Sequence, residues 1–196
     1  SGRPVDWGGP DVVWRITEGA TEELDFPVQW QSKGATILYD GADARDLINL
    51  NVGPYAHKID GILNLDGGNK VHVGFRMDNI SGSTDDGDRP SLIAPDLRAR
   101  NIRRHTLALA YGSGINVDGA WELVDLERAV VENVTMAAAA HNVGIQGIDG
   151  IRLSRTGAGD VRDAHIGKAL VRNVWSDDDE EFRDQDGIVM FSVFYD

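Results

Sequence analysis

Two short patterns recur along the chain and constrain its fold more than any other feature of the sequence. In the first pattern a glycine precedes an alternation of apolar and polar residues, and its copies begin at Asp60, Ser113, Asp149 and Asp186. In the second pattern a similar alternation ends in an asparagine, at Asn79, Asn101, Asn133 and Asn173. The two patterns alternate along most of the chain, as expected when each is one strand of a repeating unit in a solenoid.

The spacing of the asparagines fits coils of β-strands that carry inserted loops. Asn79 and Asn101 are 22 residues apart, and the next two intervals are 32 and 40 residues. In stacked parallel coils, equivalent side chains lie about 4.8 Å apart. Asparagine tolerates the left-handed backbone conformation of a bend and can hydrogen-bond to an asparagine stacked on it. The glycines are expected to serve a second corner. We therefore predict an all-β chain folded as a right-handed parallel β-helix.

The first 34 residues differ from the rest and are expected to form an N-terminal cap. They hold Trp7, Trp14 and Trp30 among short apolar stretches, and a solenoid needs bulky side chains over its open end. Residues 35–196 are then the β-helix, either complete or a fragment of a longer one. Two alternatives stay open at this point. The segment Asp118–Ala140 has apolar residues that fit one helical face, and a two-sheet sandwich also repeats strands and turns.

Charge and composition limit the partners. The net charge of −13 argues against non-specific nucleic-acid binding and against docking on anionic lipid. The chain has no cysteine, so disulfide and thiol chemistry are excluded. It also has no apolar run long enough for a transmembrane helix.

The stretch GINVDGAWELVDLERAVVENV, Gly114–Val134, resembles the pectate-lyase-like superfamily of right-handed β-helices, and the segments 61–80 and 150–174 are similar. The resemblance implies a protein that meets a polysaccharide along the flank of the helix, outside the cell or on a virion surface. It implies either a polysaccharide hydrolase or lyase, or a non-catalytic receptor-binding or structural module such as a phage tail or surface adhesin part. The residue sets of polygalacturonase-like hydrolases and of alginate epimerases are missing, so both readings stay open. Many such spikes are homotrimers, so a homotrimer is an expected assembly.

Asp60, Asp149 and Asp186 are the candidate catalytic residues, because each precedes a recurrent glycine. If the copies stack, carboxylates one coil apart lie about 5 Å from each other, which is close to the separation of about 5–5.5 Å in a retaining glycosidase. Aspartate before glycine is also a favoured turn residue, which is the structural alternative.

Aromatic and basic residues near expected corners are the candidate substrate-binding groups: Tyr111, Trp121, Trp175, Arg100 and Arg104. Aromatic rings suit sugar faces, although the tryptophans can instead fill the core, and arginines suit acidic sugars. The acidic run at Asp177, Asp178 and Asp179 is a candidate site for Ca²⁺, with a solvated loop as the alternative. No other cofactor is expected.

Overall fold

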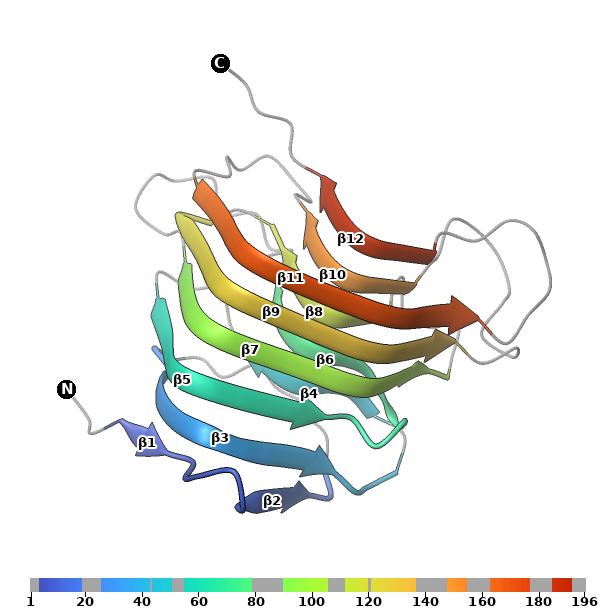
Figure 1. Ribbon diagram of the computed structural model, residues 1–196, viewed down its shortest axis with the longest axis horizontal. Coiled ribbons are helices and arrows are strands. Elements are labelled where there is room, and N and C mark those ends of the chain that lie inside the picture. The colour runs from blue at the N-terminus through green and yellow to red at the C-terminus, as the bar shows by residue number, and fades with distance from the viewer. Residues whose placement is uncertain are drawn as a thin grey trace.

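The regular secondary structure in the described part of the chain is β-strand throughout. The computed structural model describes residues 4–18, 26–42, 44–50, 55–78, 90–105, 112–119, 121–136, 148–154, 163–176 and 185–191. The front sheet of Figure 1 contains β1 (Val5–Asp6), β2 (Val13–Ile16), β3 (Gln29–Tyr39), β5 (Ala56–Asp66), β7 (Ser91–Arg104), β9 (Leu123–Met136) and β11 (Asp163–Ser176). The back sheet contains β4 (Ala44–Leu50), β6 (Val71–Asp78), β8 (Gly112–Asp118), β10 (Ile148–Ser154) and β12 (Gln185–Phe191).

From β3 onward, successive strands alternate between the two sheets (Figure 1). Every strand pair in the described residues is parallel. The all-β prediction is therefore confirmed, and the parallel sheets are consistent with the expected β-helix. The helical alternative is wrong for Leu123–Met136, which forms β9. An antiparallel sandwich is also wrong for the described strands, because their valine-rich and isoleucine-rich runs pair in parallel.

The core lies between the two sheets and consists of apolar side chains that both sheets direct inward. Along β7, Leu92 and Ala94 are buried on either side of the less buried Ile93, and Leu97 and Ala99 flank the less buried Arg98 in the same way. This alternation is the strand pleat expressed in the sequence. The back sheet contributes, among others, Phe75, Met77, Ile115, Val117, Ile151 and Leu153 to the same cluster. Among the described residues there is no helix with the length and apolar character needed to cross a bilayer.

The predicted stacking of the glycine pattern is confirmed for three of its four copies. Ser113 pairs with Asp149, and Asp149 pairs with Asp186, on β8, β10 and β12. The following isoleucines, Ile115 and Ile151, are in register as well. Equivalent positions of these copies therefore form columns that run across the back sheet.

The first copy of each pattern lies on the opposite sheet from the later copies of that pattern. Asp60 and Gly61 lie on β5 of the front sheet, where Gly61 has φ of 86° and the pairing with β7 shifts register. A Cβ at Gly61 would lie 2.1 Å from the carbonyl oxygen of Ser32, so this glycine serves a β-bulge. The segment that begins at Phe75 lies on β6 of the back sheet, and Asn79 lies outside the described residues.

The back-sheet glycines provide space between the sheets, so the predicted role as corners is wrong for Gly114 and Gly150. Neither residue has a positive φ. A Cβ at Gly114 would lie 2.3 Å from Cγ1 of Val131, and one at Gly150 would lie 2.3 Å from Cγ1 of Val171. Glycine is required here because the front sheet approaches the backbone closely.

The asparagine ladder is confirmed by both backbone and side chains. Asn101, Asn133 and Asn173 have φ of 55°, 57° and 58°. The Nδ2 group of Asn133 donates to Oδ1 of Asn101 at 3.0 Å, and Asn173 donates likewise to Asn133 at 2.9 Å. Asn101 donates in turn to Oδ1 of Asp66 at 2.9 Å. The ladder therefore begins at a carboxylate on β5, a member that the repeat pattern did not indicate.

Replacing Asn133 by alanine should lower the free energy of unfolding by about 3–4 kcal/mol. The change removes two side-chain hydrogen bonds, each contributing about 1 kcal/mol. It also places a Cβ-bearing residue without a local hydrogen bond in the left-handed region, at a cost of about 1–2 kcal/mol. Denaturant unfolding measures the loss. Asn133→Gly is the matched control, because it keeps the backbone conformation and should cost less than Asn133→Ala; equal losses would contradict the conformational part of the argument.

The N-terminal residues extend the front sheet. β1 and β2 both pair in parallel with β3. The Trp7 ring packs edge-on against Trp14 and Trp30, with centroid distances of 5.9 and 5.3 Å, and contacts the core cluster. β3 crosses the expected boundary at residue 34, and the division into cap and β-helix stays a prediction.

Candidate functional site

The candidate catalytic aspartates do not share one exposed edge. Asp149 is buried in the back sheet, where its Oδ2 accepts a hydrogen bond of 3.1 Å from Nη1 of Arg152. Asp60 lies on the front sheet and forms an ion pair of 3.0 Å with Lys58, its side chain 45% exposed. The backbone of Asp186 aligns with that of Asp149. The predicted common edge is therefore wrong for Asp60, and the Asp149 carboxylate does not reach the surface.

The three aromatic candidates have different environments. Trp121 is 2% exposed, belongs to the core cluster, and donates from Nε1 to the carbonyl oxygen of Asp163 at 3.1 Å. Its predicted role as a sugar platform is therefore wrong, and the alternative role in the core is correct. Trp175 is 46% exposed on β11. Tyr111 lies outside the described residues.

The two arginine candidates differ in their exposure to solvent. Arg100 is exposed, and its Nε donates to Oδ2 of Asp66 at 2.8 Å. Arg104 is fully buried, with Nη1 at 3.6 Å from Sδ of Met136. The prediction that Arg104 contacts a substrate on the flank is therefore wrong.

The candidate calcium ligands Asp177, Asp178 and Asp179 lie outside the described residues. Within the part of the chain that the structure describes, no cluster of three or more carboxylate or histidine side chains is arranged to hold a metal ion.

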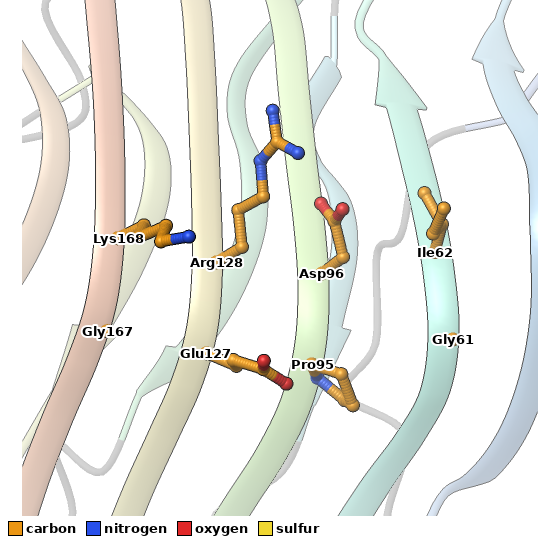
Figure 2. A pocket seen from close by; sticks show the side chains of 8 residues that line it. All are labelled: Gly61, Ile62, Pro95, Asp96, Glu127, Arg128, Gly167 and Lys168. Carbon is orange, nitrogen blue, oxygen red and sulfur yellow. The ribbon is translucent and has the colours of Figure 1, made fainter.

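The front sheet carries a groove on its outer face, and this groove is the candidate functional site. It has a volume of about 430 Å³ and is lined by Gly61, Ile62, Pro95, Asp96, Glu127, Arg128, Gly167 and Lys168. These residues come in pairs from β5, β7, β9 and β11 (Figure 2). The groove therefore crosses four neighbouring strands and runs along the stacking direction of the sheet.

Bends in the strands create the groove. Glu127 and Arg128 are consecutive and both exposed, which a regular pleat does not allow. The pairing passes from Leu126–Ala94 to Arg128–Asp96 and skips the position between them. Pro95 occupies that skipped position on β7, where its missing N–H breaks no ladder bond. Gly61 and Gly167 lack side chains at the two ends, which leaves the groove open.

The charged side chains that line the groove differ in whether they have an ion-pair partner among the described residues. Asp96 is fixed by Arg98, whose Nε and Nη2 donate to its two carboxylate oxygens at 2.8 and 2.7 Å. These hydrogen bonds raise the pKa of Arg98. Among the described residues, no ion pair engages Glu127, Arg128 or Lys168. Figure 2 shows the Arg128 guanidinium extending away from the Glu127 carboxylate and the Lys168 amine turned toward β9. As far as the described residues show, one carboxylate and two cations are thus left for a ligand.

A second depression of about 290 Å³ lies beside the groove on the same outer face. It is lined by Pro10, Gly34, Thr36, Asn64, Leu65, Arg98, Ala99, Arg100 and Glu132. The column Asp66–Arg100–Glu132–Arg172 alternates in charge, with ion pairs between Arg100 and Asp66 and between Arg172 and Glu132. Arg100 is therefore the one described candidate residue that borders either depression.

The groove residues were not among the candidates from the sequence. The only signal was a consecutive charged pair, Glu127-Arg128, inside an apolar alternation. Comparison of the chain with protein-family models, with curated proteins and with solved structures finds no match.

Proposed function

We propose that the chain is a right-handed parallel β-helix that binds a polysaccharide along its flank, in the groove across β5, β7, β9 and β11. Three observations support the fold: the alternation of strands between two parallel sheets from β3 onward, the in-register columns and the asparagine ladder. Parallel crossover connections are right-handed in nearly all proteins, which supports the handedness. This proposal includes membership of the pectate-lyase-like superfamily and a location outside the cell or on a virion surface.

The observation that carries the binding function is the direction of the groove. Four strands spaced about 4.8 Å apart give it a length of about 14 Å, which suits an extended polymer rather than a compact metabolite. Its lining combines the apolar faces of Ile62 and Pro95 with charged groups that can hydrogen-bond to hydroxyls. Arg128 and Lys168 add affinity for sugars that carry carboxylates, because both are cations that form no ion pair within the described part of the chain.

Binding is favoured over cleavage by the position of the candidate aspartates. Asp149 is buried and paired with Arg152, while Asp60 lies on the other sheet. The proposed role is therefore that of a receptor-binding or structural module that holds a glycan, and a homotrimer is the assembly proposed with it.

Filling the groove should weaken this binding strongly. Ile62→Trp places a large ring between the groove walls, so we expect at least about a tenfold loss of affinity, equivalent to about 1.4 kcal/mol. Isothermal titration against a panel of purified neutral and acidic polysaccharides measures the affinity, and an assay for new reducing ends on the same mixtures measures cleavage.

Ile93→Trp is the matched control, since Ile93 lies on the outer face of β7 but borders neither depression. It should bind as the unmodified protein does. If no polysaccharide in the panel binds, or if both variants bind equally well, the proposed function is wrong. Cleavage of a bound glycan would replace the binding role with an enzymatic one.

A further inference from the structure

The groove and the second depression lie side by side on three shared strands. On β5 the groove is bordered by Ile62 and the depression by Asn64. On β7 the corresponding residues are Asp96 and Arg98. Residues two apart on a strand are separated by about 6.6 Å, which is close to the width of one sugar ring. The two sites are thus neighbours across the strand direction.

The Asp96–Arg98 ion pair forms the boundary between the two sites. Asp96 lines the groove, Arg98 lines the depression, and two hydrogen bonds of 2.8 and 2.7 Å join them. The Asp96 side chain is 13% exposed and that of Arg98 is 34% exposed. A side chain held by two charge-assisted bonds is well ordered, so the boundary is fixed before any ligand arrives.

Both sites run in the same direction, across the strands. The groove spans β5 to β11, and the depression spans β3 to β9. One linear glycan that follows the groove cannot enter the depression without reversing its course. A side branch that leaves the main chain at the boundary can enter it.

The two sites differ in chemistry. The groove offers Arg128 and Lys168 without ion pairs among the described residues, whereas the charges beside the depression are already matched. Glu132 accepts from Arg172 and Arg100 donates to Asp66. The depression therefore presents mainly neutral hydrogen-bonding surface, including the Thr36 position and the side-chain oxygen of Asn64. The Nδ2 group of Asn64 already donates to the carbonyl oxygens of Gly34 and Ala35, at 2.8 and 3.3 Å.

We propose that this protein recognises a branched polysaccharide, with the main chain in the groove and a neutral side branch of one or two sugars in the depression. This inference rests on the proposed function, because it assigns the groove to the main chain.

The test compares a branched polysaccharide with the same polymer after enzymatic removal of its branches. Thr36→Trp fills the depression from β3, which does not border the groove. The unmodified protein should bind the branched polymer at least about tenfold more tightly, or about 1.4 kcal/mol. Thr36→Trp should bind both polymers with the lower affinity of the debranched one.

Two further variants separate this inference from the proposed function. Ile62→Trp should weaken binding of both polymers, and Ile93→Trp should weaken neither. Thr36→Leu fills less space and should give a smaller loss in the same direction, which keeps the test valid if Thr36→Trp is unstable. If the debranched polymer binds as tightly as the branched one, or if neither Thr36 variant affects the preference, the branch site is wrong while the groove assignment stands. If Ile62→Trp leaves both affinities unchanged, the proposed function itself is wrong.

Discussion

Trp121→Ala should lower the free energy of unfolding by about 3–5 kcal/mol, the range measured for large aromatic residues removed from a core. Trp121 is among the largest side chains that are essentially inaccessible to solvent, at 2% exposure, and it lies just before β9. Its indole N–H reaches the carbonyl oxygen of Asp163 at the start of β11 at 3.1 Å. The substitution therefore removes apolar contacts and leaves that carbonyl without this donor.

Urea unfolding of the purified protein measures the effect, with Trp121→Phe as the control. Phenylalanine keeps most of the apolar surface and loses the hydrogen bond, which contributes about 1 kcal/mol, so its loss should be clearly smaller. A sugar platform would behave differently. If Trp121→Ala kept its stability and lost only glycan binding, the position of this residue in the core would be wrong.

The asparagine ladder could be predicted because local preference and global stacking require the same residue. Asparagine is one of the few residues other than glycine that adopt a positive φ readily, and stacked amides satisfy one another. Asn101, Asn133 and Asn173 meet both requirements. Because two independent physical requirements favour asparagine at these positions, the ladder can be predicted from a single sequence.

The direction in which a side chain points was harder to predict. Arg100 and Arg104 are an even number of residues apart, so an unbroken pleat would place them on the same face. The bend at Asn101 shifts the alternation by one residue. Arg100 consequently faces solvent and Arg104 faces the core.

Asp60 shows a related limit. The same dipeptide, Asp-Gly, occurs at the front-sheet bulge and in the back-sheet column that contains Asp149. Only the register of β5 against its neighbours separates the two cases. Local sequence does not contain that information, because the neighbouring strands come from positions about 30 residues away.

The groove depends on the same long-range register. Ile62, Asp96, Arg128 and Lys168 form one column, yet the intervals between them are 34, 32 and 40 residues. Inserted loops make these intervals unequal, so no fixed period in the sequence connects the four positions. A site built from one or two residues per strand is visible only when the strands are paired.

Asp149→Asn should be the second strongly destabilising change, at about 3–5 kcal/mol. The carboxylate is 2% exposed and the Arg152 guanidinium is 8% exposed, with 3.1 Å between Oδ2 and Nη1. Removing the negative charge leaves the buried guanidinium without this counter-ion, and water cannot compensate at such low exposure.

A double-mutant cycle with Arg152→Met isolates the contribution of the pair. Each single variant should be strongly destabilised, while the double variant should recover part of the loss, because no charge then remains buried from this pair. Thermal and urea unfolding measure the four proteins, and glycan binding is measured on those that fold. A flank carboxylate acting in catalysis would give the opposite result: Asp149→Asn would keep the stability of the unmodified protein and abolish cleavage of a bound glycan. The cycle therefore distinguishes a residue that holds β10 in place from one that performs chemistry.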